Sequence, residues 1–137
     1  PPMSFYDKVI SEAKPNKIVI VTEDYKNPCV KGILDKYENS FVVHSNLKHS
    51  IGLILSAKKL VIGFGTFGWM QALLSKNIHT LWCPNVCTDI FDTEFENGDP
   101  FKIVRHVFED YIDQGEWVCS QEQLELMMGE VNVVEVI

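Results

Sequence analysis

The fold is decided by the stretch KLVIGFGTFGWMQALLS, residues 59–75. It begins with a short apolar run that is typical of a buried strand and continues with Gly63, Gly65 and Gly68 at G-x-G-x-x-G spacing. A segment with helical propensity follows. Such a turn lets backbone N–H groups approach an anion, and the positive end of the helix dipole favours a phosphate there. The stretch therefore predicts a phosphate-binding turn between a strand and a helix, with close packing as the alternative reason for the glycines.

Strands and helices alternate on both sides of this unit. The apolar and β-branched runs predict strands at residues 17–22, 40–44, 59–63 and 80–83. Helices are expected to begin at a Ser4–Asp7 capping box, at Asn27 with Pro28, at Asn46, and at Thr66. The last of these, residues 66–75, is apolar nearly all round and is expected to be buried. The alternation predicts an α/β fold, a Rossmann-like parallel sheet of about four strands flanked by helices.

The pattern changes after Pro84. Residues 85–98 are polar and acidic, and Asp99 with Pro100 predicts the start of a helix that carries Phe101, Val104, Phe108, Tyr111 and Ile112 on one face. A capping box of Ser120 and Gln123 predicts a second helix that ends at Gly129, and residues 131–137 are interpreted as an edge strand or a disordered tail. We therefore expect one domain, 1–137, with a β/α core at 1–84 and a C-terminal helical extension at 85–137.

The composition excludes several classes of function. The 137 residues suffice for one domain, and their hydrophobic content of 46% is ordinary for a soluble globular protein. A net charge of −7, with Arg105 as the single arginine, argues against nucleic-acid binding. No apolar run approaches the roughly 20 residues of a membrane helix, and no signal peptide opens the chain, so no membrane span and a cytoplasmic location are expected. Because the chain opens on Pro1, it is expected to be a fragment of a larger enzyme.

Metal-ligand spacings are few. Cys83-x-x-x-Cys87 has no matching second pair, so free thiols are expected. The pair Asp89 and Asp92 falls in the irregular segment rather than in a strand-end loop. We therefore expect no metal and no cofactor.

Ligands of an open parallel sheet bind beyond the carboxyl ends of the strands, which selects three loops. The first supplies the carboxylates of Glu23 and Asp24, suited to sugar or ribose hydroxyls. The second offers His44, Ser45 and Asn46, suited to a base or a ribose edge. The third is the glycine turn, where Gly65, Thr66, Phe67 and Gly68 suit a diphosphate. Each loop has a plainer reading: a solvated loop for the first, helix capping for the second, and packing for the third.

A nicotinamide dinucleotide fold is disfavoured by the order of these features. Its glycine motif normally follows the first strand, with an acidic residue about 20 positions later at the end of the next strand. Here the motif follows the third expected strand, and the next strand ends Leu81-Trp82-Cys83-Pro84 without an acid.

Residues 1–84 instead resemble the C-terminal, donor-binding half of a GT-B glycosyltransferase, most closely the α-1,2-fucosyltransferase family and its relatives. The resemblance rests on Ser4-Phe5-Tyr6 at a helix start, Val21-Thr22-Glu23-Asp24 at a strand end, and Gly65-Thr66-Phe67-Gly68-Trp69 where the family has a Ser-Thr-Phe-Ser-Trp turn. The family's His-x-Arg-x-x-Asp signature is absent.

The resemblance implies an inverting, metal-independent glycosyltransferase domain. It would bind a nucleotide-diphosphate sugar as substrate, GDP-linked by preference, and would meet the glycan acceptor through a missing domain. The alternative is a non-catalytic, Rossmann-like module for protein interaction or regulation. Its motives are the acidic balance and the Met- and aromatic-rich C-terminal segments.

Overall fold

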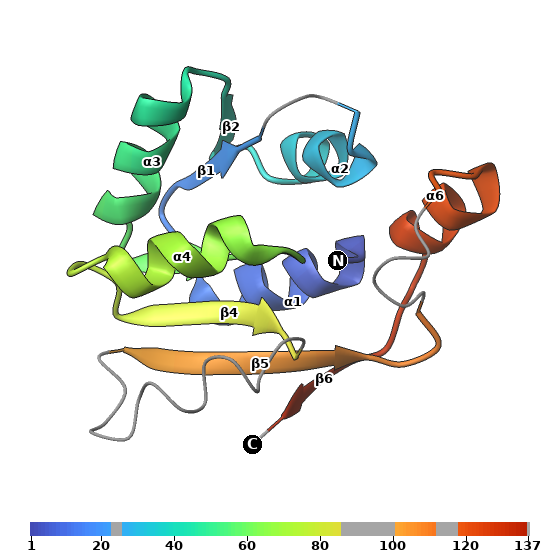
Figure 1. Ribbon diagram of the computed structural model, residues 1–137. Coiled ribbons are helices and arrows are strands. Elements are labelled where there is room, and N and C mark those ends of the chain that lie inside the picture. The colour runs from blue at the N-terminus through green and yellow to red at the C-terminus, as the bar shows by residue number, and fades with distance from the viewer. Residues whose placement is uncertain (23–25, 86–100, 112–117, 137) are drawn as a thin grey trace.

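The computed structural model describes residues 1–22, 26–85, 101–111 and 118–136. The elements follow in the order α1 (Met3–Ala13), β1 (Ile18–Val21), α2 (Pro28–Lys36), β2 (Ser40–Val43), α3 (Leu47–Ser56), β3 (Lys59–Val61), α4 (Thr66–Leu74), β4 (Thr80–Pro84), β5 (Lys102–Phe108), α6 (Gln121–Met128) and β6 (Val133–Val136). Helices flank the strands, as Figure 1 shows. The predicted α/β, Rossmann-like class is confirmed.

The described strands form two sheets. β1 and β2 pair in parallel, and a separate sheet has the order β3-β4-β5-β6. Within the larger sheet β3, β4 and β5 are parallel, while β6 pairs antiparallel with β5. The four predicted strands therefore all exist, but two of them pair apart from the others, and the larger sheet is mixed because its last two strands come from residues beyond 100.

The segment that begins at Phe101 is a strand, so the helix predicted from Asp99–Pro100 is wrong for the described residues. Val104 and His106 are buried, whereas Arg105 between them is half-buried and Val107 after them is exposed, which is the alternation of a strand. The first five residues of β5 pair with β4, from Thr80–Lys102 to Pro84–His106. Residues 99, 100 and 112, which also belonged to that prediction, lie outside the described residues. The 85–137 extension is consequently not only helical but contributes two strands to the larger sheet.

Helix caps decide where several helices begin. Asn27 and Asn46 accept hydrogen bonds from the backbone N–H groups of Cys29 and His49, and Ser120 with Gln123 forms the predicted capping box. The capping box predicted at Ser4 is absent, because α1 begins at Met3 and its N-cap is Pro2, two residues before Ser4. The Ser4 hydroxyl instead donates to the Gly129 carbonyl oxygen (3.1 Å) and accepts from the Val131 N–H (3.0 Å). It thereby ties α1 to the segment between α6 and β6.

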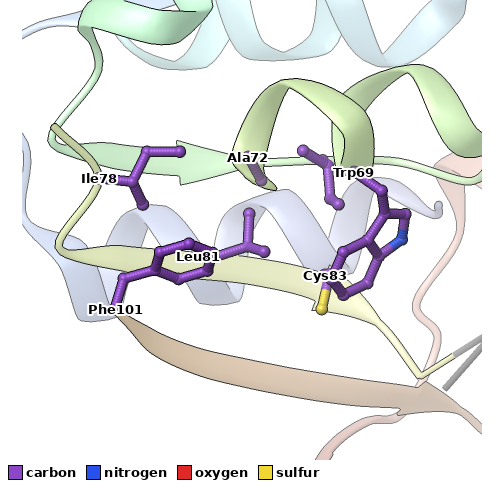
Figure 2. Close-up of a cluster of buried hydrophobic side chains, with 7 residues drawn as sticks. Trp69, Ala72, Ile78, Leu81, Cys83 and Phe101 are labelled. Atoms are coloured by element: carbon purple, nitrogen blue, oxygen red, sulfur yellow. The ribbon is translucent and has the colours of Figure 1, made fainter. Parts of the chain in front are cut away.

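The core lies on both faces of the larger sheet. On one face, α4 packs Trp69 and Ala72 against Leu81 and Cys83 of β4 (Figure 2). On the other, α1 packs Phe5 and Val9 against Trp82 and Val104. Side chains of successive strand residues point to opposite faces, which is why Trp82 belongs to one cluster and its neighbours to the other.

α4 is not buried all round, contrary to the prediction from its apolar sequence. Phe67, Met70 and Leu74 are 48%, 50% and 64% exposed. They are spaced by three and four residues and so share one face of the helix, opposite the face that covers the sheet.

Candidate functional site

The glycine turn lies at the carboxyl end of β3, between that strand and α4. Phe64 at its centre contacts the ring of Phe108 on β5, with ring centroids 5.9 Å apart in an edge-to-face arrangement. Gly63 lies against the N-terminal segment, since a Cβ there would come within 3.2 Å of Pro1 Cδ. The turn is therefore held from two sides by packing.

Gly65 has the features of a turn shaped for an approaching ligand. Its φ is +100°, a conformation that residues with a Cβ rarely adopt, yet among the described residues none but its chain neighbours comes within 4 Å of the place where a Cβ would be. The backbone geometry thus favours glycine, and the described part of the chain leaves the space above it open.

The N-terminus of α4 follows directly. Gly65 is its N-cap, no side chain caps it, and its first turn contains no acidic residue. Backbone N–H groups in a first helical turn have no partner within the helix. Thr66 and Phe67 are exposed there, so the turn presents donors and a hydroxyl to solvent without a competing carboxylate.

Gly68 serves packing. A Cβ at this position would lie 2.7 Å from Ile62 Cγ2 and 2.9 Å from Ile62 Cβ, distances that force the strand end and the helix apart. Trp69 is 5% exposed and packs in the core, as predicted. Close packing therefore explains Gly68, whereas the geometry at Gly65 fits the interpretation in which a ligand approaches the turn.

The second loop, after β2, is used in part for helix capping. Asn46 Oδ1 accepts from the His49 N–H at 3.0 Å, as the plainer reading predicted. Ser45 Oγ lies 3.3 Å from Ser50 Oγ, and His44 is exposed. In Figure 1 this loop lies at the top of the view where α3 begins, apart from the start of α4. The two loops are separated because β2 and β3 belong to different sheets and do not share an edge.

Glu23 and Asp24 of the first loop lie outside the described residues, as do Tyr25, Cys87, Asp89 and Asp92. The predicted roles of these side chains stay predictions.

A cavity of about 820 Å³ lies between the two sheets. Its walls come from β1, β3, α1 and α3, with Val19, Leu53 and Val61 among the lining residues. Of the predicted site residues that the structure describes, none lines it. Of the three glycines of the motif, only Gly63 lines the cavity, which therefore lies beside β1 and β3 and not over Gly65.

The buried cysteines offer no nucleophile. Burial raises the pKa of Cys29 to about 11 and that of Cys83 to about 12, so both are thiols at neutral pH. The sequence does not single out His106 on β5 as a site residue, because it is one histidine among four. In the structure it is 1% exposed and lies near two carboxylates. The alternation of β5 was the signal that it faces inward.

Comparisons of the chain with protein families, with curated proteins and with solved structures find no match. Within the described residues, no helix combines the length and the apolarity needed to cross a bilayer.

Proposed function

We propose that this chain is the donor-binding domain of a glycosyltransferase that takes a nucleotide-diphosphate sugar, GDP-linked by preference. The observation that carries the proposal is the turn at Gly65: its φ is +100°, and the described residues neither fill the space above it nor cap the helix N-terminus behind it with a side chain. These features suit close approach of a diphosphate to backbone N–H groups. The resemblance of residues 1–84 to the α-1,2-fucosyltransferase family supplies the reaction class.

Each candidate residue has a role in this proposal. The N–H groups of Gly65 to Gly68 and the hydroxyl of Thr66 hold the β-phosphate. Ser45, the free amide NH₂ group of Asn46, and His44 meet the base, which requires a ligand that extends from α4 toward the start of α3. Glu23 and Asp24 are assigned to ribose or sugar hydroxyls. The chemistry of transfer then needs the acceptor half, so the chain is expected to bind donor without turning it over alone.

The proposal is tested by calorimetric titration of the chain with GDP, UDP and guanosine. Thr66→Ala is expected to weaken GDP binding by about one to two powers of ten, because a hydrogen bond to a charged oxygen contributes roughly 1.5–3 kcal/mol. Guanosine lacks that oxygen and its binding should not change. Ser56→Ala is the matched control, since Ser56 is an exposed hydroxyl at the opposite, C-terminal end of a helix.

Two results contradict the proposal. Equal weakening of GDP and guanosine binding by Thr66→Ala would place the phosphate elsewhere. Absence of binding of GDP, UDP or their sugars at millimolar concentration to the folded chain would remove the donor-binding role.

A second candidate function, docking of a protein partner, is favoured by the exposed face of α4. Phe67, Met70 and Leu74 make a continuous apolar stripe there. If the stripe mediates association between copies, light scattering should show a mass that rises with concentration, and Leu74→Lys should abolish the rise. Leu47→Lys is the control, because Leu47 is equally exposed, at 64%, on a different helix. A chain that stays monomeric over the whole concentration range would argue against this function.

A further inference from the structure

His106 occupies an unusual position for an imidazole. It lies on β5, is 1% exposed, and neither of its ring nitrogens has a hydrogen-bond partner within the described residues. Its ring packs edge-to-face against Phe5 of α1, with centroids 5.4 Å apart. A buried polar group without a partner is costly, so its persistence calls for a physical reason.

Two carboxylates converge on this imidazole from different elements. Glu135 is the cross-strand neighbour of His106 in the antiparallel β5–β6 pair, and residues directly opposite each other point to the same face of the sheet. Glu12 comes from the last turn of α1, which covers that face. One ligand atom from each of the three side chains lies within 4.8 Å of the other two.

The geometry points to a site for a divalent transition-metal ion, with Zn²⁺ as the first choice, bound by Glu12, His106 and Glu135. Three protein ligands of mixed nitrogen and oxygen type, with a remaining position for water, are a known coordination of Zn²⁺. Because two carboxylates and a neutral imidazole carry a charge of −2, a divalent cation would neutralise the cluster. The ion would also give a buried nitrogen of His106 its missing partner.

The charges around His106 agree with this assignment. Burial lowers the pKa of His106 below its ordinary value and Lys8 lowers it further, while Glu12, Glu135 and the backbone of Val104 raise it. Lys8 pairs with Glu12 at 3.5 Å in a partly exposed ion pair, which the metal would replace.

The site is independent of the proposed donor site. Its ligands come from α1, β5 and β6, whereas the donor turn joins β3 to α4. A metal here would fasten α1 to the two C-terminal strands and stabilise the sheet. It is not assigned a part in sugar transfer.

The test uses the whole chain, stripped of metal with a chelator and titrated with ZnCl₂ by calorimetry, alongside thermal melts. We expect one equivalent of Zn²⁺ to bind and to raise the melting temperature. Glu12→Gln and Glu135→Gln should each weaken binding by roughly 100-fold, since even outer-shell partners of a metal are worth about 10–100-fold. Both side chains are exposed, so these variants should keep the fold.

Glu130→Gln is the matched control, because Glu130 is an exposed glutamate outside the cluster. Replacement of Zn²⁺ by Co²⁺ should give the visible absorption of a nitrogen- and oxygen-bound ion. Absence of binding to the wild-type chain would overturn the inference. So would equal affinity in wild type and all three variants, or a thiolate-to-cobalt absorption band, which would assign the metal to cysteine.

Discussion

At Gly65 and Gly68 the same residue type meets two different physical needs. Gly65 is required by its φ of +100° while the space beside it is open. Gly68 lies within α4, and a Cβ at this position would come within 2.7 Å of the side chain of Ile62, a β-branched residue. The glycine spacing alone could not separate these needs, because the spacing is identical for ligand approach and for close packing. Only the backbone angle and the distance to Ile62 distinguish them.

Gly68→Ala is expected to destabilise the chain by about 1–3 kcal/mol, the usual cost of overpacking. Ile62 cannot yield easily, because the contact involves its branched Cβ rather than a flexible end. The measurement is the free energy of unfolding in urea. Gly52→Ala is the control: Gly52 lies within α3 with nothing within 4 Å, so alanine there should stabilise the helix by roughly 0.5–1 kcal/mol.

The pair of substitutions also has a clear contrary outcome. If Gly68→Ala left stability unchanged, β3 and α4 would be farther apart than in the structure. The packing role of Gly68 would then be wrong, and ligand approach would again explain both glycines.

At the scale of elements, the C-terminal half shows where a sequence pattern is ambiguous. Phe101, Val104 and Phe108 are spaced by three and four residues and therefore fit one face of a helix. Val104 and His106 also fit the alternation of a strand, and the segment is rich in β-branched residues. The structure resolves the ambiguity through β4, whose edge pairs with this segment over five residues. A neighbouring strand edge is tertiary information that a local pattern does not contain.

Of the two capping boxes predicted from similar sequence signals, the box at Ser120 forms and the box at Ser4 does not, and tertiary contacts again account for the difference. Ser120 and Gln123 bond each other's backbone, so the local signal sufficed. Ser4 bonds Gly129 and Val131 instead, residues more than a hundred positions away. Helix starts and strands in the first half were predictable because their signals are local. The contacts that bring the C-terminal segment onto α1 were not.

At the scale of the whole molecule, helix packing as well as strand pairing holds the described strands together. α1 contributes Met3 to a cluster with Cys29 and Ile33 of α2, and Phe5 to a second cluster with Trp82 and Val104 of the larger sheet. α1 therefore packs against both α2 and the larger sheet. The sequence predicts a single sheet, whereas β1 and β3 belong to different sheets and the cavity of about 820 Å³ lies between them.

The free edges of β1 and β3 face this cavity. Ile18 donates its N–H to the Asn39 carbonyl oxygen (3.0 Å). In a parallel ladder, the backbone groups of Ile18 and Ile20 therefore bond β2, while the backbone N–H and C=O groups of Val19 and Val21 point away from β2. The Ile62 N–H likewise donates to the Trp82 carbonyl oxygen, so the backbone N–H and C=O groups of Val61 point away from β4. Val19 and Val61 are 43% and 37% exposed and line the cavity.

Amide hydrogen exchange measured by NMR should therefore differ between neighbours in one strand. The amides of Val19 and Val61 are expected to exchange with opening free energies near zero, because no described strand pairs with the edges on which they lie. The amide of Ile20, in the β1–β2 ladder, should show protection of several kcal/mol. The comparison is internal, since Val19 and Ile20 are adjacent residues of the same strand. Strong protection at both Val19 and Val61 would mean that β1 and β3 pair directly in solution, in a single sheet ordered β2-β1-β3-β4-β5-β6. In that arrangement the carboxyl ends of β2 and β3 would share one edge, and His44, Ser45 and Asn46 would lie on the same side of the sheet as Thr66.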